Sequence, residues 1–202
     1  MEIKYRDIVL RDMRESDIAD DIRWHTEETQ WARWDAPWET LEEIANFDPE
    51  SFRQKQLALL EKEKPEIRNF LELDTADCVH IGTVSSYLID EDYNWIACGN
   101  VKEGQTVYRT IGIDICEGSQ WGRGLGTQAL TAWILYFLGN GVKEICLQTW
   151  SGNLRMIACA QKLGFREIFR KLGLRLVNGQ DYDGLTFLLD VEAFRRNTPE
   201  IS

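Results

Sequence analysis

A glycine-rich loop at residues 121–127 carries the clearest chemical signal in this sequence. Gly122, Gly124 and Gly126 alternate with other residues between an apolar, strand-like run at 110–116 and a helical pattern at 127–138. Glycine allows a ligand to approach the backbone closely, and amides at the positive end of a helix attract anions. The loop therefore predicts a site for a phosphate-bearing ligand.

Two common phosphate ligands fit this loop poorly. A dinucleotide site needs the spacing Gly-x-Gly-x-x-Gly and an acidic residue after the next strand, whereas the spacing here is Gly122-x-Gly124-x-Gly126. A nucleotide P-loop needs Gly-Lys-Ser or Gly-Lys-Thr, which the sequence lacks. Coenzyme A, which also carries a pyrophosphate, is the third class of ligand and the one we favour.

The loop and a second segment together resemble the GCN5-related N-acetyltransferase (GNAT) superfamily. The family pattern Gln/Arg-x-x-Gly-x-Gly/Ala reads here as Trp121-Gly-Arg-Gly124-Leu-Gly126, so that only Trp121 departs from it. The segment at 153–165, Asn-Leu-Arg-Met-Ile-Ala-Cys-Ala-Gln-Lys-Leu-Gly-Phe, is similar to the second family motif. The resemblance covers residues 7–191 and is greatest to the Rim-type branch, which acetylates ribosomal proteins.

The resemblance implies a mixed α/β fold with a central, mostly antiparallel sheet that is splayed at the cofactor site and flanked by helices. It also implies a single domain at 7–191, followed by a short tail at 192–202. The residue patterns agree with such a fold. They predict strands at 8–13, 67–73, 80–89, 110–116, 144–150, 165–172 and 185–191. They predict helices at 15–25, at 41–62 with a break at Asp48-Pro49, at 127–138 and at 153–164.

The resemblance implies acetyl-CoA as the co-substrate. Amides of the loop would bind the pyrophosphate, and an amide of the preceding strand would polarise the thioester carbonyl. The residues expected to contact acetyl-CoA are Asp114, Ile115, Cys116, Gly122, Arg123, Gly124, Leu125, Gly126, Thr127 and Asn153. Asn153 has an equal alternative role as the N-cap of a helix.

In this family an amine attacks the thioester directly, while a base removes the ammonium proton and an acid protonates the departing thiolate. The usual acid, a tyrosine of the second motif, is replaced by Ala160, and a catalytic glutamate of some relatives is replaced by Gln148. The remaining candidates are Asp114, His80, Tyr87 and Glu117. We expect Glu117 to be the best placed of them, because it follows the strand at the cofactor site.

Tryptophans gather where this family forms its acceptor pocket. Trp31, Trp34 and Trp38 could enclose a cationic substrate, although packing of a loop against the sheet explains them as well. Asp35 would add negative charge to this region. The acceptor itself is open between a protein N-terminus, a polyamine, an aminoglycoside and a small amine.

The composition limits the partners of the chain. A net charge of −11 argues against nucleic acid as a direct partner. The sequence contains no run of about 18 apolar residues, so we expect no membrane span. Five cysteines without Cys-x-x-Cys spacing are typical of reduced thiols in the cytoplasm, with no metal or disulfide. The Rim-type branch implies a possible homodimer.

The main alternative function is a non-catalytic acyl-CoA-binding module, since the usual acid and base are missing. A nucleotide-binding domain is less favoured.

Overall fold

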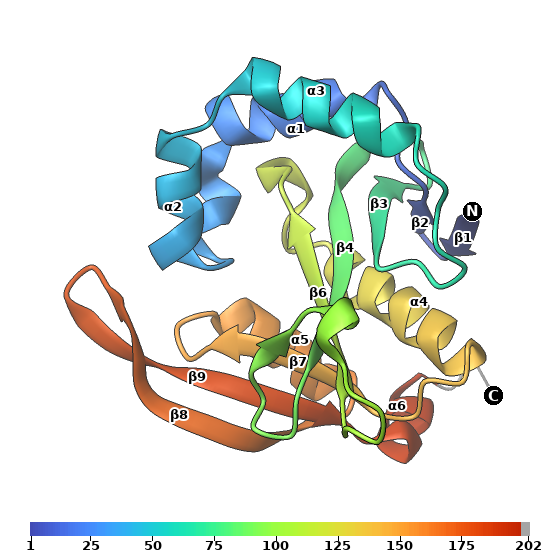
Figure 1. Ribbon diagram of the computed structural model, residues 1–202, viewed down its shortest axis with the longest axis vertical. Coiled ribbons are helices and arrows are strands. Elements are labelled where there is room, and N and C mark those ends of the chain that lie inside the picture. Colours follow the sequence, from blue (N-terminus) through green and yellow to red (C-terminus); the bar gives the residue numbers. More distant parts are fainter. Residues whose placement is uncertain (199–202) are drawn as a thin grey trace. The chain divides into compact units, whose positions relative to one another are not determined.

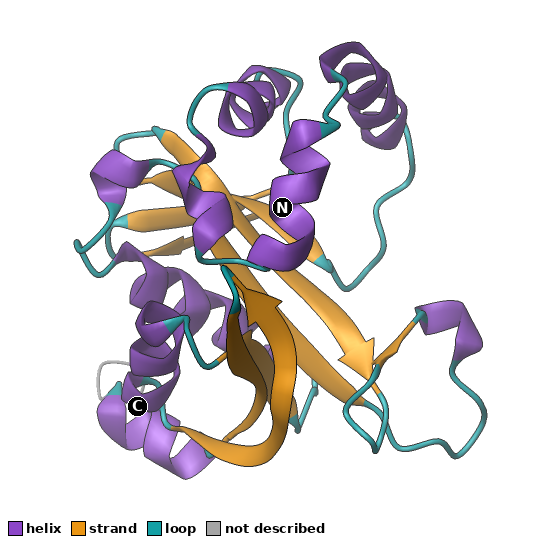
Figure 2. Ribbon diagram, turned by 90° about the vertical axis from the view of Figure 1, so that its left-hand side faces the viewer, coloured by secondary structure: helices purple, strands orange, loops and turns teal. Residues whose placement is uncertain are grey.

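The computed structural model describes residues 1–198; Figure 1 labels the helices and strands, and Figure 2 colours them by type. The strands are β1 (Glu2–Tyr5), β2 (Ile8–Arg11), β3 (Phe70–Thr75), β4 (His80–Ile89), β5 (Trp95–Ile96), β6 (Tyr108–Ile115), β7 (Ile145–Trp150), β8 (Phe165–Val177) and β9 (Gln180–Leu189). The α-helices are α1 (Asp17–Thr26), α2 (Pro37–Ala45), α3 (Pro49–Leu60), α4 (Leu125–Gly139), α5 (Leu154–Lys162) and α6 (Val191–Asn197). Short 3₁₀ helices are η1 (Thr29–Arg33), η2 (Cys98–Asn100) and η3 (Gly118–Gln120).

Hydrogen bonds link the strands in the order β1-β2-β3-β4-β6-β7-β9-β8, and β5 pairs with β4. β6 and β7 are parallel, whereas β1–β2, β2–β3, β4–β5, β7–β9 and β8–β9 are antiparallel. The parallel ladder ends at the pair Ile111↔Leu147, although β6 runs on to Ile115 and β7 to Trp150. The predicted mixed, mostly antiparallel sheet is confirmed, and a ladder that ends before its strands is what a splayed sheet requires.

The contacts between residues divide the chain into two compact units. The first consists of residues 1–84 and 113–132, and the second of residues 85–112 and the described residues from 133 onward. The first unit contains α1, α2, α3 and the glycine loop, and the second contains α5, α6 and the strands β7, β8 and β9. The expectation of one domain at 7–191 remains a prediction.

Prolines start two of the helices in the first unit. Pro37 and Pro49 stand at the first positions of α2 and α3, where the fixed φ of proline suits a helix and its missing N–H is not needed. Asp48 caps α3, since its side chain accepts hydrogen bonds from the amides of Glu50 and Ser51. The predicted break at Asp48-Pro49 is therefore confirmed, while the first of the two helices begins at Pro37, earlier than the predicted residue 41. Helices α1 and α3 pack side by side (Figure 1).

Strand β3 buries side chains on both of its faces. Leu71 and Leu73 are fully buried on one face, and Glu72 and Asp74, which alternate with them, are 1% and 4% exposed on the other. The polar face is covered by α1, because Asp17 of that helix shares a partner, Arg11, with Asp74. Buried carboxylates are destabilising unless they are paired with cations or hydrogen-bond donors, so β3 needs such partners from the neighbouring strand and helix of the first unit.

The C-terminal part of the second unit differs from the predicted pattern. β8 and β9 extend to a tight turn at Asn178 and Gly179, which both have positive φ, so the hairpin is longer than the predicted strands (Figure 1). The predicted strand at 185–191 ends at Leu189, because Asp190 caps α6 by accepting a hydrogen bond from the amide of Ala193. Residues 191–197 form this helix, and residues 199–202 of the predicted tail lie outside the described residues.

The most apolar helix is α4, which has 15 residues and buries Leu130, Trp133, Ile134 and Phe137 completely. A helix that is apolar on most sides is a core helix when it is this short. Within residues 1–198, no helix has both the length and the apolar composition needed to cross a membrane.

We expect Gly82→Ala to reduce the free energy of unfolding by at least about 2 kcal/mol. Gly82 has a φ of +155°, and a Cβ atom there would lie 1.9 Å from the backbone oxygen of Asp114, which cannot rotate away. Urea denaturation followed by circular dichroism measures the change. Gly99→Ala is the matched control, because nothing lies within 4 Å of its Cβ position. Equal stability of Gly82→Ala and the wild type would contradict this close approach of β4 and β6.

Candidate functional site

The glycine loop joins β6 to α4 and lies within the first unit. Gly122 and Gly124 have φ angles of +76° and +79°, which glycine adopts without steric strain. Gly126 has no positive φ, lies in the first turn of α4, and would place a Cβ atom 3.5 Å from Cδ1 of Ile115. The first turn of a helix has N–H groups without partners inside the helix, so this loop ends at the positive end of α4, a type of position that favours anions.

Two side chains fix the entry of the loop. Nε1 of Trp121 donates a hydrogen bond of 2.7 Å to the carbonyl oxygen of Ile115, which ties the start of the loop to the end of β6. Arg123 is exposed and donates to the side-chain oxygen of Gln120. Trp121 thus has a structural role at the position where it departs from the family pattern, and Arg123 adds positive charge to the loop.

Directly after β6, two backbone amides are bonded to one carbonyl of β4. The oxygen of Ile81 accepts the amides of Cys116 at 2.8 Å and Glu117 at 3.3 Å. The Cys116 amide is therefore used within the sheet, which weakens its predicted contact with a thioester. Its thiol is 6% exposed, and burial together with the charge of Asp114 raises the pKa of that thiol well above its ordinary value. A protonated, buried thiol is a poor nucleophile.

Glu117 is held by two residues of α1. Its Oε1 accepts hydrogen bonds from Arg23 and, at 2.9 Å, from Nε1 of Trp24. Burial acts to raise the pKa of Glu117, but the bonds from Arg23 and Trp24 outweigh it and leave that pKa below its ordinary value. Such a carboxylate is a weak base, so these contacts favour a positioning role, and its predicted catalytic role stays a prediction. The sequence holds no signal for Arg23, which is 94 residues away.

Asp114 has the opposite electrostatic setting. It is half-buried on β6, and loss of hydration together with the neighbouring charge of Asp35 raises its pKa well above the ordinary value. Asp35 is exposed as a residue, but loss of hydration at its carboxyl group raises its pKa as well, and its Oδ2 accepts a hydrogen bond of 3.1 Å from Thr40. Two carboxyl groups whose charges disfavour each other can hold a proton near neutral pH or attract a cation.

The tryptophans of this region have different environments. Trp24 and Trp31 are 1% and 8% exposed and form a cluster with Ala32 and Cys116, against which Trp121 also packs. Nε1 of Trp31 donates to the carbonyl of Trp24. The structure thus gives Trp31 a packing role, whereas Trp34 and Trp38 are half-buried. Their predicted place in an acceptor pocket remains a prediction.

The second unit contains the residues of the second motif. Asn153 caps α5, since its Oδ1 accepts the amide of Met156 at 3.0 Å, so the N-cap alternative is what the structure contains. Gln148 accepts a hydrogen bond from the hydroxyl of Tyr87 at 3.0 Å and donates to Thr186 at 3.1 Å. The structure therefore brings Tyr87 and Gln148 together, and Ala160 is completely buried. The predicted contact of Asn153 with acetyl-CoA stays a prediction.

Comparison with known proteins adds a family assignment to this geometry. A family model described as the acetyltransferase (GNAT) domain matches residues 7–166. No curated protein sequence matches the chain.

Three solved structures share the fold over nearly the whole chain. The ribosomal-protein-S5-alanine acetyltransferase of Vibrio fischeri is 17% identical with a TM-score of 0.67, over 93% of this chain and 95% of that one. The RimL ribosomal L7/L12 α-N-protein acetyltransferase in complex with coenzyme A is 17% identical with a TM-score of 0.66, over 93% and 97%. A spermidine N-acetyltransferase chimera from Vibrio cholerae SpeG and hSSAT is 14% identical with a TM-score of 0.63, over 94% and 99%. At these identities the likeness is one of fold.

We expect a thiol reagent at pH 8 to label Cys78 and Cys98 rapidly and Cys116 and Cys146 only after unfolding. The first two are exposed and the second two are buried, and burial raises the pKa of Cys146 to about 12. Mass spectrometry of timed samples identifies the labelled residues, and a Cys78→Ser/Cys98→Ser variant should lose the fast phase. Rapid labelling of Cys116 in the folded protein would show that its thiol is accessible and reactive after all.

Proposed function

The chain belongs to the GNAT acetyltransferase domain family, and from that premise we propose that it moves an acetyl group from acetyl-CoA to a primary amine. The observation that carries the proposal is the glycine loop, where two left-handed residues, Gly122 and Gly124, lead into the first turn of α4. A pyrophosphate needs this kind of backbone, because donors and a helix dipole must come within hydrogen-bonding distance of its oxygens.

The residues of the loop fit a pyrophosphate. Among residues 1–198, no atom outside the neighbouring residues lies within 4 Å of the positions where the Cβ atoms of Gly122 and Gly124 would be, so the backbone there is open to a ligand. Arg123 supplies a positive charge on the exposed side of the loop. Asp114 and Ile115, on the strand before the loop, are the proposed backbone contacts of the thioester arm.

In the proposed reaction the amine nitrogen attacks the thioester carbon directly. A C–N bond forms, the C–S bond breaks, coenzyme A leaves as a thiolate, and the attacking nitrogen loses a proton. Direct attack is favoured over an acyl-cysteine intermediate, because the raised pKa keeps the thiol of Cys116 protonated.

Among the candidate side chains, Asp114 is the proton acceptor that we propose. Its pKa is raised, whereas the pKa of Glu117 is lowered by its bonds to Arg23 and Trp24. A general base works best when its pKa is near the operating pH, and a carboxylate reaches that range only when it is desolvated or lies near another negative charge. Glu117 then serves as a positioning residue that fixes the turn from β6 into the loop.

The acceptor that we propose is a primary amine that is cationic at neutral pH. The carboxyl groups of Asp35 and Asp114 favour a positive charge between them, and the overall charge of −11 favours the approach of cations. Within the family we place the chain nearest the Rim-type branch, so a protein N-terminus is the first acceptor to test and a homodimer the oligomer to test. The specific alternative is a non-catalytic acyl-CoA-binding module, which Ala160 and Gln148 favour.

We expect Gly124→Ala to weaken acetyl-CoA binding at least about 10-fold, because a side chain there would hold a phosphate off the backbone. Gly124 has a φ of +79° and nothing within 4 Å of its Cβ position, so the methyl group meets no protein atom and the left-handed backbone costs only about 1–2 kcal/mol of stability. Calorimetry with acetyl-CoA and urea denaturation measure the two effects separately. Gly104→Ala is the matched control, because Gly104 has a φ of +76° and nothing within 4 Å of its Cβ position but lies outside the loop; it should lose similar stability and leave binding unchanged. Absence of acetyl-CoA binding by the wild type would rule out the proposed donor.

We expect release of the coenzyme A thiol when acetyl-CoA is mixed with one of three acceptors: a peptide with a free N-terminus, spermidine or an aminoglycoside.

Asp114→Asn should lower kcat about 100-fold, since a general base contributes a factor of roughly 10²–10⁴ to the rate. The wild-type rate should rise with pH as the raised pKa of Asp114 is passed, and this step should be missing in Asp114→Asn but kept in Glu117→Gln. Tight acetyl-CoA binding without release of the coenzyme A thiol for any amine would favour the non-catalytic module. If only Glu117→Gln loses the pH step, Glu117 and not Asp114 is the general base.

A further inference from the structure

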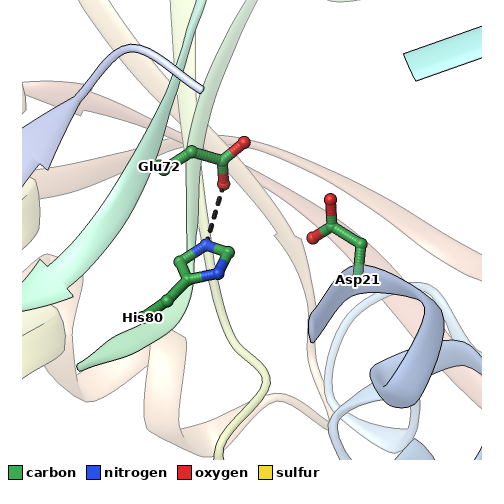
Figure 3. A group of neighbouring side chains, drawn as sticks. All are labelled: Asp21, Glu72 and His80. Carbon is green, nitrogen blue, oxygen red and sulfur yellow. Dashed lines mark hydrogen bonds and ion pairs between the residues drawn. The ribbon is translucent and has the colours of Figure 1, made fainter. Parts of the chain in front are cut away.

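Three buried ionisable side chains meet between α1 and the sheet of the first unit. Asp21 comes from α1, Glu72 from β3 and His80 from the start of β4, and Figure 3 shows them turned toward one another. They are 9%, 1% and 8% exposed. One ligand atom of each lies within 4.8 Å of the ligand atoms of the other two.

The cluster contains carboxylate oxygens without partners. Oε2 of Glu72 lies 3.0 Å from Nε2 of His80, whereas Oε1, which is fully buried, has no hydrogen-bond partner. Among residues 1–198, the carboxylate of Asp21 has no hydrogen-bonding or ion-pairing partner either. A buried carboxylate without a donor is destabilising by more than an ordinary lost hydrogen bond, so a native structure normally supplies one.

The nearby arginines are already paired with other acids. Arg11 donates to Asp17 at 2.6 and 2.9 Å and to Asp74 at 2.7 Å, with its whole guanidinium in use. Arg23 is paired with Asp20 and with residues outside the cluster. Arg11 stands opposite Glu72 in the pairing of β2 with β3, and its charge acts on that carboxylate, but its hydrogen bonds go to Asp17 and Asp74. Neither Arg11 nor Arg23 is hydrogen-bonded to Glu72 or Asp21.

A proton on His80 does not complete the cluster. It would allow Nε2 to donate to Oε2 of Glu72, but Oε1 and the Asp21 carboxylate would remain without donors. The other ring nitrogen, Nδ1, lies 3.3 Å from Oδ2 of Asp20. If Nδ1 carries the hydrogen and donates it to Asp20, Nε2 presents a lone pair on the side of Glu72, as in a carboxylate-oriented histidine that binds a metal.

We propose that Asp21, Glu72 and His80 bind a divalent transition-metal ion, with Zn²⁺ as the preferred ion. One imidazole and two carboxylates are a suitable donor set for Zn²⁺, with water at a fourth position. Ligand bonds of about 2.0–2.2 Å would draw the three groups closer by roughly 1 Å, which side-chain rotation can supply. The expectation of no metal came from cysteine spacing, which says nothing about donors contributed by three separate elements.

The metal site would hold α1 against the sheet of the first unit and would not react with substrate. All three donors are nearly inaccessible to solvent, and the ring of Trp24 lies against His80 with centroids 4.7 Å apart. The ion would join α1 to β3 and β4, and α1 carries Arg23 and Trp24, which hold Glu117. The proposal does not depend on acetyl transfer, and its test does not use activity.

The test measures metal bound by the full-length protein after treatment with a chelator and dialysis against Zn²⁺, Mn²⁺ or Mg²⁺. We expect about one tightly bound Zn²⁺ per chain, weaker Mn²⁺ and no bound Mg²⁺. Glu72→Gln and Asp21→Asn should each raise the Kd for Zn²⁺ at least about 10-fold. Glu192→Gln, whose side chain is 89% exposed, is the control for removing a carboxylate, and Cys78→Ser/Cys98→Ser excludes binding by exposed thiols.

Zn²⁺ should also raise the Tm of the wild type and of both controls, because a ligand that binds only the folded state stabilises it. This measurement needs no variant of the cluster, so it holds even where Glu72→Gln or Asp21→Asn fails to fold. The proposal is overturned if the wild type binds no Zn²⁺ above background or if Zn²⁺ leaves its Tm unchanged. It is also overturned if the cluster variants bind Zn²⁺ with the same Kd as the wild type, or if the cysteine variant loses binding.

Discussion

The buried guanidinium of Arg11 is the interaction on which the first unit depends. Arg11 is 3% exposed and pairs with Asp17 of α1 and Asp74 of β3. Removing one member of such a buried network leaves an unpaired charge, which costs roughly 3–5 kcal/mol. These pairs join β2, β3 and α1, so the position of the helix is set by directional charge pairing as well as by the apolar packing of Ile18.

The placement of α1 determines the electrostatics at two further positions. Arg23 and Trp24, on this helix, reach Glu117 at the end of β6 and lower its pKa, directly before the glycine loop. Asp21, on the same helix, meets Glu72 and His80. One helix thus supplies the cation that keeps Glu117 charged and one carboxylate of the interior cluster.

The parts that could be predicted from the sequence are those controlled by a few neighbouring residues. The Asp48 cap before Pro49, the turn at Asn178-Gly179 and the cap at Asn153 each follow from the preference of one or two residue types. Two late strands around this turn were predicted, but their full length and the helix α6 were not, because the length is set by pairing between the strands and α6 by the burial of Phe194.

The sequence by itself determined the family, the mixed sheet and the glycine loop between strand and helix at 122–127, because glycine spacing and alternating apolar residues act over short distances along the chain. Only the tertiary structure decided in which direction the pKa of each candidate acid is shifted. Glu117 and Arg23 are 94 residues apart and His80 and Asp20 are 60 apart, so no local pattern connects them. A pKa depends on burial and on the nearest charges in space. Folding raises the pKa of Asp114 and lowers the pKa of Glu117.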